Sequence, residues 1–229
     1  MLFAALASLL WIVNSVYSIG YMRGNRETHQ TRFYACFAIA LAAAMGVAFA
    51  GNLLTLFLCY EVLTVSTYPL VAHKGDKATV RSARVYLGIL MGTSIALFLP
   101  AILWTQTVAG TLDFVPGGIL DGVMDGPAVG LLLALFAFGI AKAAIMPVHR
   151  WLPAAMVAPT PVSALLHAVA VVKAGVFSIT KVITYIFGIE FLSGQPSAGW
   201  LTGLAAFTIL GASAVALAQT NLKRMLAYS

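Results

Sequence analysis

The amino-acid sequence predicts an all-α membrane protein with about seven transmembrane helices, one of them broken. Of its 229 residues, 61% are hydrophobic and only 9% are charged, whereas about 25% of residues are charged in an ordinary soluble domain. This composition cannot supply a water-facing surface, which excludes a soluble globular enzyme. The apolar runs are long, do not alternate with polar residues and are rich in Ala, Leu and Gly, so an outer-membrane β-barrel is excluded too.

Seven apolar runs are long enough to cross a bilayer, which takes roughly 20 residues of helix. In chain order, their expected limits are 1–22, 33–50, 52–72, 85–108, 127–146, 162–187 and 200–219. The basic residues near the first run follow it, whereas a cleaved signal peptide has them in front, so we expect a retained helix. Residues 1–229 then form a single transmembrane domain.

The charges between the runs predict the orientation in the membrane. Basic residues follow the first, third and seventh runs, and acidic residues follow the fourth and sixth. They are Arg23, Arg26, Arg32, Lys74, Lys77, Arg81, Arg84, Lys223 and Arg224 on one side, and Asp113, Asp121, Asp125 and Glu190 on the other. Because short cytoplasmic loops carry an excess of Lys and Arg, we expect a multi-pass protein of a bacterial inner membrane. Its N-terminus would lie outside and its C-terminus in the cytoplasm.

Most of the Lys and Arg residues behind the formal charge of +6 lie in these loop clusters, so they imply contact with a lipid bilayer and no nucleic-acid partner. Cys36 and Cys59 each lie alone inside an apolar run and match no zinc site or disulfide framework, so we expect both to be packing residues. No dinucleotide-binding glycine motif is present either. We therefore expect neither a cofactor nor a metal in this chain.

Four prolines interrupt the chain between the fifth and sixth runs, at Pro147, Pro153, Pro159 and Pro161. Each proline removes a backbone donor and clashes with the preceding turn, which predicts a broken helix. Irregular backbone at membrane depth persists only where protein or a water-filled cavity satisfies its polar groups, and such breaks recur along ion and substrate pathways. The alternative is a short interfacial loop that ends in a half-helix.

Three charged residues lie well inside the apolar runs, namely Glu61, Lys142 and Lys173. An Asp, Lys or Arg at the centre of a membrane helix costs about 2.5–3.5 kcal/mol on insertion scales, so a functional site is the default hypothesis for all three. For Glu61 and Lys142 the alternative is a buried salt bridge that holds two helices together. Lys181 lies near a helix end and can reach the interface, which favours a structural role.

The neighbours of Glu61 predict a polar stripe. Thr64 and Tyr68, three and seven residues further on, share its helix face. A chain of hydroxyl groups leading away from the carboxylate would suit proton movement.

A second stripe is expected on the sixth run, where Ser163 and His167 share a face. Lys173 lies roughly 120° around the helix from His167 and would need its long stem or a bridging water to join it. His149 lies in the broken segment, two residues after Pro147. For each histidine the alternative is a hydrogen-bonded packing role.

These residue types suit a proton relay. A solvated lysine holds its proton up to about pH 10.4, burial weakens that hold and a nearby carboxylate strengthens it. Lys142 would therefore be charged when Glu61 is close and could release its proton when Glu61 turns away. His167 is a natural acceptor, because imidazole exchanges protons near neutral pH.

Two stretches carry a family resemblance. Residues 51–64 (GNLLTLFLCYEVLT) and 147–155 (PVHRWLPAA) resemble the antiporter-like membrane subunits shared by Mrp-type multisubunit sodium/proton antiporters and respiratory complex I. Residues 67–73 (TYPLVAH) and 163–175 (SALLHAVAVVKAG) look most like the D subunit of an Mrp antiporter. The similarity runs over essentially the whole chain.

The resemblance implies that residues 33–187 form one five-helix antiporter-like repeat. Family members have two inverted repeats and about fourteen helices, so residues 200–229 would begin a second repeat that is missing here. The chain could be a gene fragment, a partial sequence or a split protein.

The resemblance also implies roles for individual residues. Glu61 matches the essential glutamate of the family's fifth helix, Lys142 the lysine of the broken seventh helix, and Lys173 the lysine of the eighth. His149 and His167 match histidines of the same region.

We therefore expect an ion transporter subunit rather than an enzyme. It would translocate protons, through these five residues, within a hetero-oligomeric monovalent cation/proton antiporter, with other membrane subunits as partners. The alternatives are a proton-pumping subunit of a complex I-like or hydrogenase redox complex, and a membrane scaffold that transports nothing.

Overall fold

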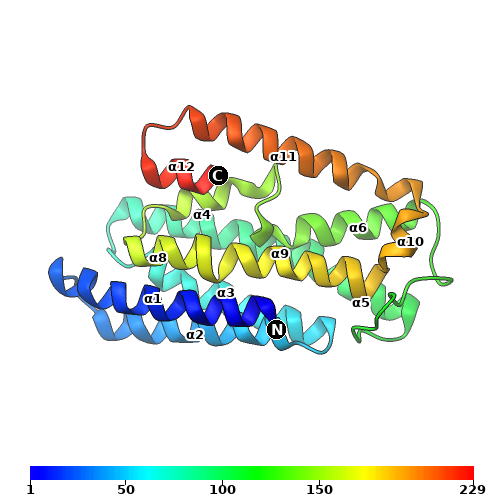
Figure 1. Cartoon of the computed structure of the whole chain (residues 1–229), viewed down its shortest axis with the longest axis horizontal. Helices are drawn as coiled ribbons and strands as arrows, with labels where there is room; N and C mark the ends of the chain where they lie inside the picture. The colour runs from blue at the N-terminus through cyan, green and yellow to red at the C-terminus, as the bar shows by residue number, and fades with distance from the viewer.

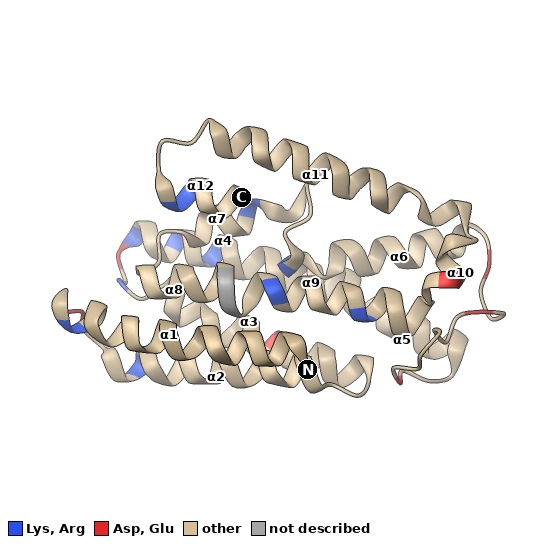
Figure 2. Ribbon diagram, in the orientation of Figure 1, with Lys and Arg blue, Asp and Glu red and all other residues tan. Residues whose placement is uncertain are grey.

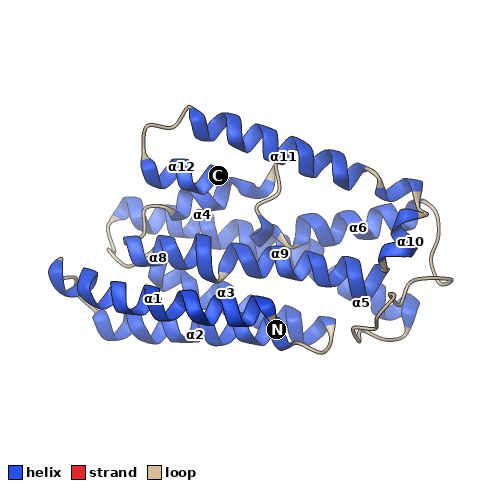
Figure 3. Cartoon of the chain, in the orientation of Figure 1, coloured by secondary structure: helices blue, strands red, loops and turns tan.

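The computed structural model describes the backbone of residues 1–229 and every side chain except those of Ala168 and Val169. It is a bundle of helices joined by loops (Figures 1 and 3), which confirms the predicted fold class. The α-helices are α1 (Leu2–Gly24), α2 (Gln30–Phe49), α3 (Leu53–Val71), α4 (Lys77–Thr93), α5 (Leu99–Ala109), α6 (Pro127–Gly139), α7 (Trp151–Ala155), α8 (Thr160–Ala164), α9 (Val171–Lys181), α10 (Ile189–Ser193), α11 (Trp200–Leu217) and α12 (Leu222–Tyr228).

Shorter helical turns join several of these elements. The π-helical turns are η1 (Ser94–Phe98), η4 (Leu165–Val169) and η5 (Val182–Phe187), and the 3₁₀ turns are η2 (Ala141–Ala143), η3 (Val148–Arg150) and η6 (Pro196–Ala198). With these turns included, the described residues contain six helices long and apolar enough to cross a membrane. They are Leu2–Gly24, Gln30–Phe49, Leu53–Val71, Lys77–Ala109, Thr160–Phe187 and Pro196–Leu217.

Side-chain caps fix where several helices begin. Asn52 precedes α3 and its side chain accepts a hydrogen bond from the backbone N–H of Thr55 at 2.7 Å. Asp76 accepts from the N–H of Thr79 in the same way at the start of α4, and Asn221 caps α12. Each cap satisfies a backbone donor that has no partner within the helix.

The fifth apolar run forms a shorter helix than expected. The run 127–146 is helical only as far as Gly139, where α6 ends, and the chain then turns through η2 with Ala144 in the left-handed region at φ 57°. The predicted break is therefore present, but it begins eight residues before Pro147. The last residue of α6 packs closely against η1, since a Cβ at Gly139 would lie 2.5 Å from the backbone nitrogen of Phe98.

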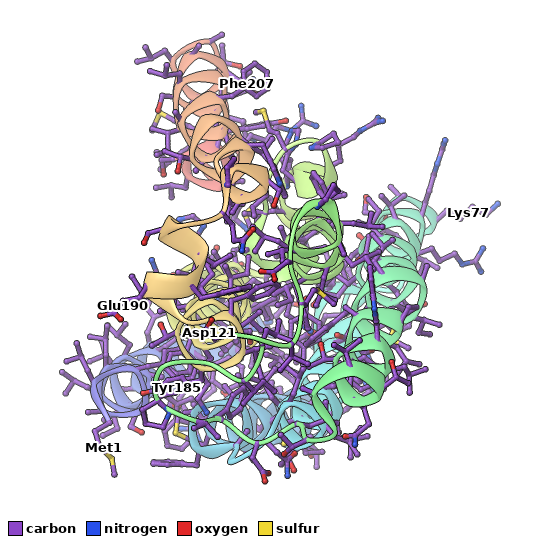
Figure 4. The ribbon with its side chains drawn as sticks, turned by 90° about the vertical axis from the view of Figure 1, so that its right-hand side faces the viewer. Met1, Lys77, Asp121, Tyr185, Glu190 and Phe207 are labelled. Carbon is purple, nitrogen blue, oxygen red and sulfur yellow. The ribbon has the colours of Figure 1, made fainter. Side chains whose placement is uncertain are left out.

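Helices α2 and α3 lie side by side, and α9 runs through the middle of the bundle (Figure 1). Helix α11 stands out from the other helices in Figure 4, where its Phe207 is labelled. Ala216 is the buried residue of α11, whereas Phe207, Leu210 and Leu217 are 63%, 72% and 89% exposed. Such a contiguous apolar face is typical of contact with lipid or another membrane segment.

Charges gather at the two ends of the bundle (Figure 2). The blue segments lie mostly at the end formed by the α1–α2 and α3–α4 loops and α12, and α10 and the α5–α6 loop at the opposite end carry acidic residues. Lys142 lies in η2, and Lys173 and Lys181 lie in α9, outside these loops. This separation is expected of a protein with two different membrane faces.

His73 is buried at the basic end, just after α3, and is 4% exposed. Its Nε2 lies 3.7 Å from the Glu27 carboxylate, its carbonyl accepts a hydrogen bond from Arg32, and its ring meets the edge of Phe33. Burial lowers the pKa of His73 below its usual value near 6.5, although the charge of Glu27 acts in the opposite direction.

We expect acid to destabilise the fold through His73. As the pH falls below about 6.5, the unfolded chain takes up a proton at this position before the folded chain does, so stability declines until the lower folded-state pKa is passed. Melting temperatures of the purified protein in detergent, measured from about pH 7.5 to pH 5, should fall less in His73→Gln than in the wild type. His29→Asn, which changes an exposed histidine, is the control. An equal decline in His73→Gln and wild type would contradict the assignment.

Candidate functional site

Lys142 is fully buried, in η2 directly after the end of α6. Its ammonium nitrogen, Nζ, donates hydrogen bonds to the carbonyl oxygen of Tyr60 at 2.7 Å and to the hydroxyl of Thr64 at 2.6 Å. Nζ also lies 3.0 Å from the centroid of the Tyr60 ring, a cation–π contact. The helix break thus directs the lysine at one face of α3.

Tyr60 also fixes the backbone of the break. Its hydroxyl accepts a hydrogen bond from the backbone N–H of Lys142 at 3.1 Å. Tyr60 is itself fully buried, with its ring edge-on to Phe98. The sequence alone did not single out Tyr60. Its position directly before Glu61 was the one feature that could have identified it.

Glu61 lies beside this contact without joining it. Glu61 and Lys142 form no salt bridge, although both belong to the described part of the chain. Both carboxyl oxygens of Glu61 are buried and accept no hydrogen bond from a described group. Glu61 directly follows Tyr60 in α3, so its side chain projects from the neighbouring face of the same helix.

The expected hydroxyl stripe is directed toward the lysine instead of the carboxylate. Thr64 donates to the Tyr60 carbonyl at 3.1 Å and accepts from Lys142. Its one donor hydrogen is therefore not available to the Glu61 carboxylate. Thr67, one turn further along α3, pairs with the hydroxyl of Tyr86 at 2.6 Å. The polar groups of α3 therefore face the break and α4.

Two further polar groups of the break, the Ala141 carbonyl and the Met146 N–H, are bonded to protein side chains. The Trp151 indole N–H donates to the carbonyl of Ala141 at 2.9 Å, and the backbone N–H of Met146 donates to the hydroxyl of Thr208 on α11 at 3.3 Å. Partners of this kind are required for non-helical backbone at membrane depth.

The close packing of α9 against the break depends on Gly175. A Cβ at this position would lie 2.3 Å from the backbone nitrogen of Ala143 and 2.4 Å from the carbonyl carbon of Lys142. Real Cβ atoms do not approach backbone so closely, so only glycine allows α9 to lie directly against η2. Gly175 thereby allows α9 to pack directly against the backbone of Lys142.

The remaining three residues of the predicted site line one cavity. Its volume is about 270 Å³, and His149, His167 and Lys173 lie on its wall together with groups from α11 and the C-terminal residues. Lys173 is exposed and the two histidines are partly buried. The Nδ1 atoms of both histidines are buried without a described hydrogen-bond partner. The structure thus brings these three together, apart from Glu61.

His167 also borders a second cavity, of about 300 Å³, which it shares with Ser163 and Lys223. Ser163 bonds to carbonyls of the preceding turn and makes no hydrogen bond to His167. Ser163 and His167, for which the sequence predicts a shared helix face, therefore line the same cavity, and no hydrogen bond joins them. Lys223 reaches this wall from α12 and donates to the carbonyl of Ala158 at 2.8 Å.

The residues given structural roles pack as expected. Lys181 donates to the carbonyl of Ala50 at the end of α2 and lies over the Phe114 ring. Cys36 and Cys59 are free and pack against the core. Among the side chains that the structure describes, no three His, Cys, Asp or Glu gather closely enough to hold a metal ion.

Residues 50–229 match the model of a family described as NADH:quinone oxidoreductase/Mrp antiporter, TM. A probable K⁺/H⁺ antiporter subunit of Rhizobium meliloti (strain 1021) is 34% identical, with 100% of this chain and 22% of that protein aligned. NADH-quinone oxidoreductase subunit N of Desulforudis audaxviator is 32% identical, over 93% of this chain and 42% of that protein.

A solved structure with the same fold belongs to the membrane-bound sulfane sulfur reductase, an archaeal respiratory membrane complex. Its matching chain superposes with a TM-score of 0.78 at 28% identity, covering 99% of this chain and 46% of that one. The present chain therefore spans less than half the length of each of these three proteins.

Proposed function

The chain belongs to the NADH:quinone oxidoreductase/Mrp antiporter transmembrane family, and on this premise we propose that it is the proton-translocating subunit of a multisubunit monovalent cation/proton antiporter. The observation that carries the proposal is the fully buried Lys142 at the break after α6, held against α3 beside Glu61. A buried lysine at a helix break is costly for stability and suited to passing protons.

We propose that Glu61 and Lys142 act as a coupled pair. Lys142 carries a proton on its amine, and the carboxylate of Glu61 controls how firmly that proton is held. The cavity lined by His149, His167 and Lys173 would continue the relay, because a cavity of about 270 Å³ has room for several water molecules. Protons would pass along it between the histidines, Lys173 and the lysine at the break.

The relay would work within an assembly. We propose that other membrane subunits cover the exposed face of α11, and that residues 33–187 form the first repeat of the antiporter-like unit. The basic end of the bundle would face the cytoplasm, with the N-terminus outside and the C-terminus inside. Protons and monovalent cations would be the transported ions.

A redox-driven pump is the second candidate function. The similarity to part of an NADH-quinone oxidoreductase and to a chain of a respiratory complex favours it. The two candidates differ in the source of energy. Vesicles that carry the complete assembly should exchange ions when a sodium or potassium gradient is imposed if the antiporter proposal holds, whereas a pump needs an electron donor.

The experiment that tests the antiporter proposal replaces Glu61 with glutamine. The carboxamide keeps the shape of the side chain and loses its charge, so we expect cation/proton exchange per assembled complex to fall at least tenfold, within the range typical of lost proton-transfer groups. Exchange is followed with a pH-sensitive dye in vesicles, and native gels measure the amount of complex. Glu190→Gln, at an exposed position of α10, is the control.

Two results would contradict the proposal. Unchanged exchange in Glu61→Gln would remove the carboxylate from the mechanism. Loss of the assembled complex, with normal exchange by the complex that remains, would favour a membrane scaffold instead.

A further inference from the structure

The Lys142 ammonium meets three partners from two residues of α3. They are the carbonyl oxygen of Tyr60, the hydroxyl oxygen of Thr64 and the face of the Tyr60 ring. An ammonium has three donors and accepts nothing; two hydrogen bonds and the ring contact therefore partner it here without a carboxylate. The site is enclosed, because Tyr60, Thr64 and Lys142 are all fully buried.

A second place for the same ammonium lies next to the first. Glu61 follows Tyr60 directly, and its buried carboxyl oxygens receive no hydrogen bond from a described group. Adjacent helical residues point about 100° apart. The two places therefore lie on neighbouring faces of one helix.

A move between these two places would involve the side chain of Lys142 and not its backbone. Its backbone is held by the Tyr60 hydroxyl on one side and by the contact with Gly175 on the other. The flexible four-carbon stem of lysine can turn about its own bonds while the backbone stays fixed.

From this geometry we infer that Tyr60 and Thr64 form a second resting place for the Lys142 ammonium, and that the lysine alternates between it and the Glu61 carboxylate during ion exchange. The inference rests on the proposed function. Tyr60 and Thr64 are positioning residues: they offer the ammonium full hydrogen bonding away from the carboxylate, so that leaving Glu61 does not strand a charge in an apolar interior. Without this second resting place, the Lys142 ammonium would remain paired with the Glu61 carboxylate.

The test removes the Thr64 hydroxyl and keeps the shape of the side chain. In Thr64→Val the ammonium loses an acceptor at the second resting place, and we expect exchange per assembled complex to fall about tenfold, the worth of one hydrogen bond to a charged group. Thr64→Ser restores the hydroxyl and should return exchange to within about twofold of wild type. A residue that only fills space would show no such difference between valine and serine.

Thr105 provides a matched control. It is also fully buried in a membrane helix, and its hydroxyl also donates to the carbonyl four residues earlier, at 2.8 Å. Its hydroxyl has no ammonium beside it among the hydrogen bonds of the described residues. Thr105→Val should therefore exchange ions like the wild type, and comparison with Thr64→Val isolates the contact with Lys142.

Each outcome decides between the two ideas. If Glu61→Gln is defective while Thr64→Val and Thr105→Val both match wild type, the second resting place is wrong and the proposed function stands. If Glu61→Gln exchanges normally, the proposed function fails and the inference fails with it. Should the valine complex not assemble, Thr64→Ala replaces it, and equal exchange by the alanine and serine variants overturns the inference.

Discussion

Replacing Lys142 with methionine is expected to abolish cation/proton exchange and leave the assembled complex in the membrane. Methionine has a similar length and can fill the buried space, but it carries no proton. The polar groups of α3 would not be left without partners, because Thr64 still donates to the Tyr60 carbonyl. Removing one partner of a buried salt bridge is strongly destabilising, but no salt bridge joins Lys142 to Glu61 among the described residues, so we expect the complex to tolerate the loss of the charge.

We expect exchange per complex to fall about a hundredfold or more, to the background of empty vesicles. Lys181→Met is the matched control, because Lys181 also lies outside the loops, in α9, and makes a hydrogen bond and a cation–π contact. Its loss should leave exchange per assembled complex unchanged. Substantial exchange by Lys142→Met would show that protons cross the membrane by another route.

The second large effect is expected from Gly175→Ala. The added methyl group would lie 2.3 Å and 2.4 Å from backbone atoms of Ala143 and Lys142, and these atoms cannot turn aside as a side chain can. Either α9 or the break must shift, which changes the position of Lys142 relative to Tyr60. We expect exchange to fall at least tenfold, with less complex on native gels, because overpacking costs typically about 1–3 kcal/mol.

Gly88→Ala in α4 is the control for this substitution. An added Cβ at Gly88 meets no atom within 4 Å, and alanine is the better helix former by about 1 kcal/mol. The same chemical change should therefore be neutral or stabilising there. Equal behaviour of the two variants would show that the packing of α9 against η2 tolerates an extra methyl group.

The membrane helices could be predicted from composition and length. The run 52–72 corresponds closely to α3 (Leu53–Val71), because the capping residue Asn52 marks in the sequence where the helix begins. In the run 127–146 the sequence does not show that the helix ends at Gly139, since the residues that follow are mostly apolar and include alanines, which favour helix. The end of α6 and the turn after it contact distant parts of the chain, namely Phe98, Tyr60 and Gly175, which the local sequence does not indicate.

The candidate site could be predicted by residue type and only in part by arrangement. Burial cost identified Glu61 and Lys142 from the sequence, but helical periodicity does not determine which of two adjacent faces a neighbouring segment approaches. The approach occurs at Tyr60 and Thr64. Likewise, Lys173 lies around the helix from His167, and the two meet across a cavity whose other walls come from distant elements. The roles of all five predicted residues stay predictions.

The slight packing of α11 has a consequence for the hydration of Lys173. Ala216 is the buried residue of this helix, yet Thr208, Ile209, Ala212 and Ser213 of the same helix form a wall of the cavity that contains Lys173. A sideways step of α11 would widen that cavity at little energetic cost to the core. We therefore expect lateral pressure on α11 from neighbouring lipid or protein to change the number of waters that this cavity can hold around the Lys173 amine.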